Sequence, residues 1–171
     1  MTLDVGCGYT PRGDVNCDIK MTPCVDVICS AEALPFKDGS FDEVHSQFVI
    51  EHCADPVRMI REMVRVTRNK AIITTNDISW PGYALHSILG KGFLMTDPEH
   101  VYGWSAHYMR NLLHRLGLHE FKVSYLTEYG RDGRIYSKLT QRLFYWFVTW
   151  PLSKLGLKPD FRVEVECGIV S

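Results

Sequence analysis

Apolar residues along the chain fall into short runs and spaced stripes, and this pattern predicts an alternation of strands and helices. Short runs that are rich in β-branched residues, or that alternate in polarity, are typical of strands. The strands predicted in this way cover residues 2–5, 15–19, 25–29, 41–48, 71–75, 121–126 and 162–169.

Two helices with clear boundary signals are predicted between these strands. Asp55 followed by Pro56 is typical of an N-cap and a first helical position, and Ser105 can cap a second helix that Gly117 ends. Their apolar stripes are Val57, Ile60 and Val64 in the first helix and Met109, Leu112, Leu113 and Leu116 in the second. Strands that alternate with helices predict an α/β fold with a mostly parallel sheet and ligands at the carboxyl ends of its strands.

Composition and charge narrow the class of protein. With 171 residues, 46% of them apolar and 23% charged, the chain has the size and composition of one globular domain, so a disordered or collagen-like chain is excluded. The net charge of -1 argues against a nucleic-acid-binding protein. No apolar run approaches the roughly 18 residues of a membrane span. No secretory signal is visible either, so we expect a cytoplasmic protein.

The cysteines offer a metal site only weakly. Six of them are scattered along the chain without a C-x-x-C pair. A thiol site would use Cys24 and Cys29 together with Cys7 or Cys53, and these lack the spacing of zinc ligands. We therefore expect buried, reduced thiols and no metal ion.

A glycine-rich turn, LDVGCG at residues 3–8, follows the first predicted strand. Glycines let the backbone bend sharply there and let a ligand approach the amide groups closely. The dinucleotide-binding pattern G-x-G-x-x-G, with an acid about 20 residues further on, is not met. Pro11 stands at the third glycine position, and Asp18 comes only ten residues after Gly8. Only six residues separate Gly8 from Val15, too few for a full crossover helix, which argues against an NAD-dependent reductase.

Five motifs, in order and in register, resemble those of class I S-adenosylmethionine-dependent methyltransferases, in the small type 11 group. They are LDVGCG at 3–8, AEALPF at 31–36, SFDEV at 40–44, IEH at 50–52 and EMVRV at 62–66, within a resemblance over roughly residues 1–126. The resemblance implies a Rossmann-like methyltransferase fold: a seven-stranded, mostly parallel sheet whose last strand is antiparallel, with S-adenosylmethionine over the first two strands. The first crossover helix should be shortened or absent here, because its connection is short.

The resemblance also assigns cofactor contacts by position. Gly6, Cys7 and Gly8 would line the methionine moiety through their backbone, and Asp4 would brace their loop. Asp18, at the end of the second strand, would accept hydrogen bonds from both ribose hydroxyls, which suits an acceptor-only carboxylate.

Three further positions depart from the family or lie nearer the methyl group. Ser30, followed by Ala31, stands where the family usually has an Asp for the adenine amino group, so this contact would come mainly from the backbone. Gln47, at the end of the fourth strand, would face the transferred methyl group. The missing Asp and crossover helix keep a second hypothesis open, that of a non-catalytic binding or partner-activating module.

Histidines near the carboxyl ends of the strands are the candidate catalytic groups. Glu51 and His52 come just after the fourth strand, and His52 could act as a base in methyl transfer or pack as a histidine at a helix start. His100 lies in DPEHV at 97–101, which resembles the family's D-x-x-H-V ahead of a helix. For His100 we favour a structural hydrogen bond that pins the 76–104 segment over a catalytic role.

The segment between the last two strands combines aromatic and basic residues. Leu139, Leu143, Trp146, Phe147 and Trp150 recur at helical offsets, and residues 131–162 hold seven bases and two acids. The part at 137–158 fits a helix at a membrane surface, a cover over an apolar substrate, or a helix packed on the sheet or a dimer contact.

We expect one methyltransferase domain over 1–171, with 76–104 and 127–161 as insertions on the substrate or partner side. Its methyl acceptor would be a small molecule or a lipid-linked one.

Overall fold

Seven strands form one mixed sheet in the computed structural model, which describes residues 1–82, 99–126, 143 and 145–167. The strands are β1 (Thr2–Val5), β2 (Val15–Asp18), β3 (Val27–Ile28), β4 (Phe41–Gln47), β5 (Thr67–Asn76), β6 (Phe121–Leu126) and β7 (Asp160–Glu166). Their order in the sheet is β3-β2-β1-β4-β5-β7-β6. β7 runs antiparallel to β5 and β6, and the other pairs are parallel. The expected mostly parallel sheet with an antiparallel last strand is confirmed.

The two helices predicted from their caps are present. The Asp55 carboxylate accepts a hydrogen bond from the Arg58 amide ahead of α1 (Pro56–Val66), and the Ser105 hydroxyl accepts one from the Tyr108 amide ahead of α3 (Ala106–Arg115). Gly117 follows α3 with a φ of 79°, a conformation that favours glycine. Residues 6–14 between β1 and β2 contain no helix, as their short length predicted.

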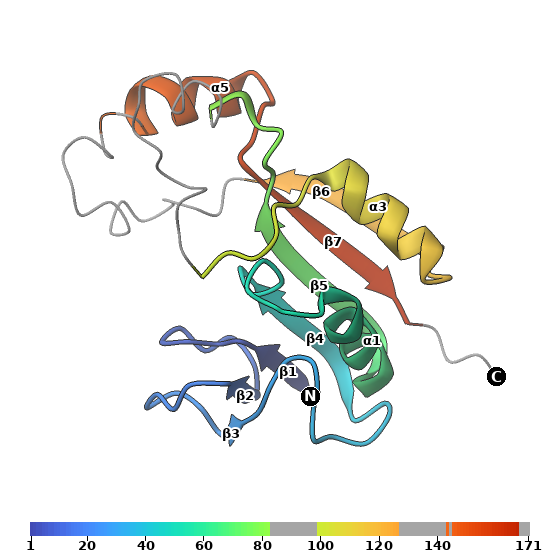
Figure 1. Cartoon of the computed structure of the whole chain (residues 1–171). Coiled ribbons are helices and arrows are strands. Elements are labelled where there is room, and N and C mark those ends of the chain that lie inside the picture. The colour runs from blue at the N-terminus through green and yellow to red at the C-terminus, as the bar shows by residue number, and fades with distance from the viewer. Residues whose placement is uncertain (83–98, 127–142, 144, 168–171) are drawn as a thin grey trace.

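Both α1 and α3 lie on the same face of the sheet, where the core forms (Figure 1). Alternate strand residues share this face because the register pairs Leu3 with Val44, Val44 with Ala71 and Ala71 with Val165. The helices contribute Met59, Ile60, Met63, Met109 and Leu113, all fully buried, to the same hydrophobic cluster. The core is therefore one layer between a helix pair and a sheet.

The other face of the sheet is polar. Lys70 of β5 lies 3.3 Å from the Glu164 carboxylate and 3.5 Å from that of Glu166, and Glu43 pairs with His45 at 3.3 Å on β4. No helix covers this face within the described residues (Figure 1). Charged side chains at these strand positions are compatible with solvent, so the sheet is stable with an apolar layer on one side only.

β2 and β4 each end one residue earlier than predicted, and three other strands differ from the prediction by two residues or more at one or both ends. β3 covers only Val27–Ile28, since the Val25 amide closes a turn on the Thr22 carbonyl and the Asp26 carboxylate binds Asn16. β5 begins at Thr67, directly after α1, rather than at residue 71. β7 begins at Asp160 rather than at residue 162, and residues 168–169 lie outside the described ones.

The C-terminal connection contains a π-helical turn, η1 (Tyr145–Thr149), followed by α5 (Trp150–Lys154). The first part of the predicted amphipathic segment, including Leu139, lies outside the described residues. None of the described helices is long and apolar enough to cross a membrane.

Candidate functional site

A cavity of about 710 Å³ opens at the carboxyl ends of β1, β2 and β4. The strand order reverses between β1 and β4, and ligands of open α/β sheets bind at such a switch point. The volume lies in the range of roughly 300–1,000 Å³ that is usual for small-molecule sites. Of the residues predicted to bind a cofactor, those that line the cavity are Gly6, Gly8, Asp18, Ser30 and Ala31.

The glycine turn is locked onto β2 by its own amides. The amides of Gly6 and Cys7 both donate to the Cys17 carbonyl, at 2.8 and 3.1 Å. Gly6 has a φ of 75°, and a Cβ there would lie 2.3 Å from Cγ2 of Val49. Only glycine fits this position, because a side chain would meet both the unfavourable backbone conformation and the next wall of the cavity.

Asp18 joins the turn to the strand that follows it. Its Oδ2 accepts a hydrogen bond from the Gly8 amide at 2.9 Å, and its Oδ1 accepts one from the Lys20 amide at 2.8 Å. A carboxylate offers about four acceptor positions. Two backbone donors therefore leave the cavity-lining carboxylate able to accept two more hydrogen bonds.

Three of the predicted cofactor-binding residues do not line the cavity, and neither does the catalytic candidate His100. Asp4 is buried beside it, and its Oδ2 accepts a hydrogen bond from the Arg12 amide at 3.0 Å, which braces the end of the glycine loop. Burial raises the pKa of the Asp4 carboxyl, and nearby Arg12 partly offsets this rise. The Cys7 thiol is buried, and Gln47 is paired in register with Thr74 on the polar face of the sheet. The residues after Gln47, Phe48 and Val49, take the cavity wall instead.

Sequence reasoning missed several apolar residues of the cavity wall, Phe48, Ile19 and Met21 among them. Phe48 directly follows β4 and has a φ of 55°, an uncommon conformation for a bulky side chain. Ile19 and Met21 line the cavity although they are 69% and 70% exposed. The sequence does contain one sign of these residues, since apolar side chains follow directly after Asp18. Exposed apolar side chains at a cavity can cover the face of a flat ligand ring.

Glu51, His52 and His100 come together at the cavity, which His52 lines. The rings of His52 and His100 have centroids 4.6 Å apart and cross at 71°. Nδ1 of His52 lies 3.1 Å from the Glu99 carbonyl oxygen. A carbonyl only accepts, so Nδ1 holds the proton and the lone pair of His52 is on Nε2.

Glu51 is buried next to these rings, with 2% of its surface exposed. Its Oε2 accepts a hydrogen bond from the Thr75 hydroxyl at 3.1 Å, whereas Oε1 has no hydrogen-bond partner among the described residues. Burial raises the pKa of the Glu51 carboxyl. A buried acceptor without a partner is costly, so this oxygen calls for a physical explanation.

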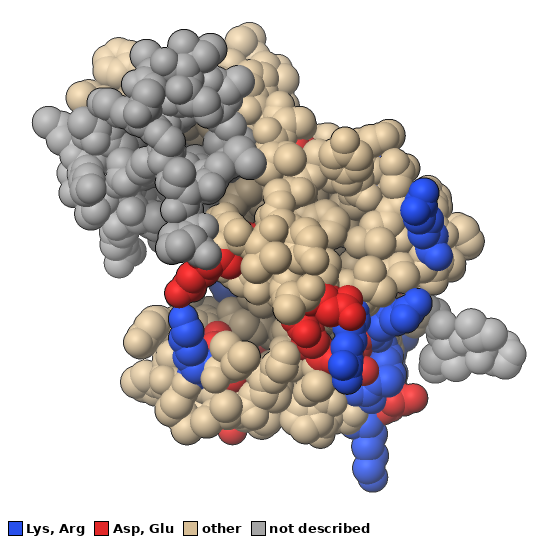
Figure 2. All heavy atoms as spheres, in the orientation of Figure 1, with Lys and Arg blue, Asp and Glu red and all other residues tan. Residues whose placement is uncertain are grey.

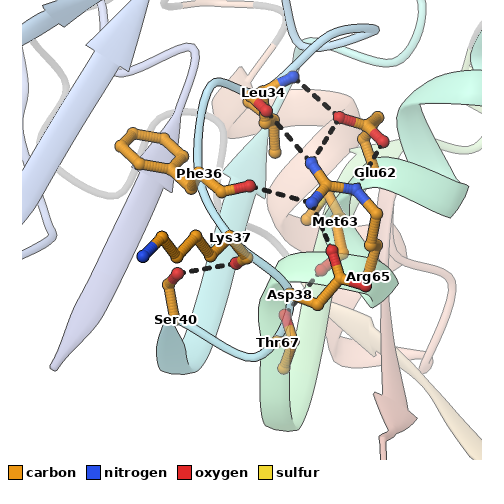
Figure 3. Close-up of polar contacts among 9 residues, drawn as sticks. All are labelled: Leu34, Phe36, Lys37, Asp38, Ser40, Glu62, Met63, Arg65 and Thr67. Carbon is orange, nitrogen blue, oxygen red and sulfur yellow. Dashed lines mark hydrogen bonds and ion pairs between the residues drawn. The ribbon is translucent and has the colours of Figure 1, made fainter.

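Segment 30–36, whose first three residues line the cavity, is tied to α1 by Arg65 (Figure 3). The guanidinium donates to both carboxylate oxygens of Glu62, to the Leu34 and Phe36 carbonyls and to the Asp38 carboxylate, at 2.7 to 3.0 Å. Glu62 also accepts a hydrogen bond from the Leu34 amide at 2.9 Å. All five donors of the guanidinium are used, which gives the EMVRV and AEALPF motifs a structural role.

Charge on the face shown in Figure 2 is mixed. Acidic and basic side chains lie side by side over and below α1, and no single extended basic area is visible on that face.

Comparisons with known proteins match the chain to methyltransferases. Residues 14–75 match a family model described as a methyltransferase domain. An uncharacterized methyltransferase of Mycobacterium sp. (strain JLS) is 45% identical over 56 residues, which are 33% of this chain and 22% of that protein. The demethylmenaquinone methyltransferase of Mycolicibacterium paratuberculosis is 37% identical over 65 residues, 38% of this chain and 28% of that protein. The match thus spans less than a third of these curated relatives.

A solved structure extends the similarity to nearly the whole chain. The crystal structure of an S-adenosylmethionine-dependent methyltransferase from Thermotoga maritima, a possible histamine N-methyltransferase, is similar with a TM-score of 0.62 and 16% identity. The alignment covers 96% of this chain and 81% of that one. The sheet and its cavity define a Rossmann-like domain of the methyltransferase type. Together with the family match, they confirm the resemblance to class I S-adenosylmethionine-dependent methyltransferases.

Proposed function

We propose that the protein transfers a methyl group from S-adenosylmethionine to a small-molecule or lipid-linked acceptor. The observation that supports this most directly is the cavity, whose walls include the Gly6 turn, the Asp18 carboxylate and His52. The family match and the similar structure support the same class of reaction.

The residues at the blue, N-terminal end of the sheet in Figure 1 suit the cofactor. S-adenosylmethionine supplies a methyl group made electrophilic by its sulfonium. In our proposal, Asp18 accepts hydrogen bonds from the ribose hydroxyls, and the exposed Ile19 and Met21 side chains cover the adenine ring. The lack of a side chain at Gly6 leaves the space for the methionine end.

At the acceptor end, His52 is the residue we propose to act on the acceptor. Its Nε2 lone pair can take a proton from an acceptor hydroxyl or amine, with Nδ1–H held by the Glu99 carbonyl. His100 packs against the His52 ring and would position it. Orientation of the reacting groups in a dry site supplies up to ~7–11 kcal/mol in favourable cases, so this positioning matters as much as proton transfer.

Calorimetric titration of the full chain with S-adenosylmethionine tests the cofactor assignment. We expect binding by the wild type and at least a tenfold loss of affinity in Asp18→Asn, which keeps the size of the side chain and removes its charge. Asp14→Asn is the matched control, because Asp14 bonds to Thr2 at the opposite edge of the sheet. Equal affinity in wild type and Asp18→Asn would contradict the ribose assignment.

A non-catalytic binding module is the second candidate. One observation favours it: the amides of Gly6, Cys7 and Gly8 are all bonded within the protein, which leaves fewer backbone donors for a cofactor carboxylate. Such a module would show no heat of binding with S-adenosylmethionine or S-adenosylhomocysteine in the same titration. Binding of either nucleoside removes this candidate.

The acceptor side of the proposal includes peripheral membrane contact through the 137–158 segment. Its described part exposes Trp146, Phe147, Trp150 and Leu155, by 60%, 76%, 44% and 77%, with Lys154 stacked 5.7 Å from the Trp150 ring. Exposed aromatic residues beside lysines suit the interface of a bilayer with anionic lipids. We expect the protein to float with phosphatidylglycerol vesicles, and the double variant Trp146→Ser and Phe147→Ser to remain unbound.

A change elsewhere on the surface provides the control for this flotation. Tyr9 is 79% exposed in the glycine loop, so Tyr9→Ser removes a comparable aromatic surface from a different place. Equal flotation of the double variant and the wild type would refute the membrane contact.

A further inference from the structure

We infer that Glu51, His52 and His100 bind a single divalent transition-metal ion of the Zn²⁺ type. Each residue offers one ligand atom, and the three atoms lie within 4.8 Å of one another. This departs from the sequence expectation of no metal, which considered cysteines. Among the described residues the candidate ligand group contains two imidazoles and a carboxylate instead.

The cluster is assembled by backbone contacts across the fold. The Val101 and Tyr102 amides both donate to the Glu51 carbonyl, at 2.8 and 3.2 Å. These two bonds hold the segment that contains His100 against the residues that follow β4. Because Nδ1 of His52 is bonded to the Glu99 carbonyl, its Nε2 is left as the ligand atom. A metal-binding histidine commonly has its other nitrogen fixed by such a bond.

The free oxygen of Glu51 is the second, independent observation. Oε1 is buried without a hydrogen-bond partner among the described residues, although Oε2 is bonded to the Thr75 hydroxyl. Glu51 is 2% exposed, and burying its carboxylate with one oxygen unbonded carries a desolvation cost. A bound cation would offset this cost. Thr75 in turn orients the carboxylate, as outer partners of metal ligands do.

The donor set indicates the kind of ion. Two imidazole nitrogens and one carboxylate oxygen suit Zn²⁺ and its neighbours in the first transition row better than Mg²⁺ or Ca²⁺, which prefer oxygen ligands alone. Bonds of about 2.0–2.1 Å in a tetrahedral site place ligand atoms about 3.3 Å apart. Small rotations of the two histidine side chains, both only partly buried, would bring the three atoms to that spacing.

The site would select the methyl acceptor, an extension that rests on the proposed function. Three protein ligands leave a coordination position open. His52 lines the cavity, so a ligand in the cavity can reach that position. An acceptor with a hydroxyl or carboxylate oxygen would bind there, and the ion would lower the pKa of a bound hydroxyl. With the ion present, Nε2 of His52 would be a ligand and no longer a free base.

Metal titration of the chelator-treated full chain tests the site without any cofactor or acceptor. We expect one equivalent of Zn²⁺ in calorimetry and the visible absorption of tetrahedral Co²⁺ on titration with that ion. His52→Ala and His100→Ala should each weaken Zn²⁺ binding at least tenfold, and so should Glu51→Gln. Circular dichroism checks that each variant is folded. If Glu51→Gln fails to fold, the two histidine variants decide the result, since both side chains are partly exposed.

A second pair of histidines provides the control. His114 and His119 approach within 3.3 Å through their Nδ1 atoms on the surface, so they could also attract a metal ion. His114→Ala should leave the one-equivalent binding unchanged. Absence of Zn²⁺ and Co²⁺ binding, or binding that survives in His52→Ala and His100→Ala, would overturn the inference. Titration with S-adenosylmethionine is independent of this test, so failure of the metal site and failure of the proposed function are distinguishable.

Discussion

Replacement of Arg65 by alanine should destabilise the protein more than any other single change of a charged residue on α1. Its guanidinium links the helix to segment 30–36 through the Leu34 and Phe36 carbonyls, and it binds the carboxylates of Glu62 and Asp38. Alanine removes every one of these donors at once. Of the hydrogen bonds between segment 30–36 and α1 in the described structure, the bond from the Leu34 amide to Glu62 then remains.

The size of the effect follows from the number and exposure of the lost bonds. Hydrogen bonds to charged groups contribute about 1.5–3 kcal/mol each, but bonds in one network are not additive. The Arg65 side chain is 30% exposed and the Asp38 side chain is 81% exposed, so water replaces part of what is lost and the Asp38 pair adds little. The loss therefore comes mainly from the bonds to two carbonyls and to the Glu62 carboxylate, and we expect the free energy of unfolding to fall by about 2–4 kcal/mol. Arg65→Lys should recover less than half of this loss, because an ammonium cannot reproduce the planar fork.

Urea denaturation monitored by circular dichroism measures the effect. Arg61→Ala is the matched control, because Arg61 is exposed on the same helix. Surface changes of this kind stay within about 0.5 kcal/mol of the wild type. If the free energy of unfolding of Arg65→Ala also lies within that margin, the Arg65 hydrogen bonds contribute no stability in solution, and the structural role given to the EMVRV motif is refuted.

Three further predictions test other parts of the structure. Gly6→Ala should abolish binding of S-adenosylmethionine in calorimetry, because its Cβ would lie 2.3 Å from Cγ2 of Val49. A Cβ at Gly8 would have no heavy atom within 4 Å, so Gly8→Ala should lower the free energy of unfolding in urea by only ~1–2 kcal/mol, the cost of a left-handed backbone conformation. Met109→Ala should lower the free energy of unfolding by about 2–5 kcal/mol through a cavity in the core, and a loss below 1 kcal/mol would contradict the packing of α3 on the sheet. The guanidinium partner of Glu62 lowers the pKa of that carboxyl, so its stabilisation is complete above the ordinary carboxyl pKa and is lost as the pH falls through the lowered one. Denaturation midpoints measured from neutral to acidic pH should therefore fall less steeply in Glu62→Gln than in the wild type, and parallel curves would count against the ion pair.

Part of the candidate site could be predicted from local sequence, and part could not. The turn at Gly6 and the carboxylate at Asp18 stand directly after strands, so a parallel sheet brings them to one edge. Gln47 was expected at the cavity, but strand alternation places it on the polar face, in register with Thr74. A shift of one residue reverses the side of a strand, and sequence alone did not show that the chain turns at Phe48 with a positive φ.

The cluster at the acceptor end shows the same limit more clearly. His52 and His100 were each noticed as single residues, one beside a strand and one ahead of a helix. Their approach depends on two backbone bonds from Val101 and Tyr102 to Glu51, residues some fifty positions apart in the sequence. No local sequence pattern indicates such a contact, and none indicates that Oε1 of Glu51 lacks a hydrogen-bond partner among the described residues.

The amino-acid sequence by itself determined the succession of strands and helices along the chain, the two helix caps and the class of fold. Hydrophobic periodicity and capping interactions act within a few residues, so local sequence is enough to specify them. It also determined that residues 6–14 could not form a crossover helix, because chain length limits what a connection can contain. Only the tertiary structure decided that α1 and α3 share one face, that Lys70 and its acidic partners make the other face polar, and that buried Glu51 lies next to two histidines. These features depend on strand register and on distant chain segments meeting, and both are set by the packing of the whole domain.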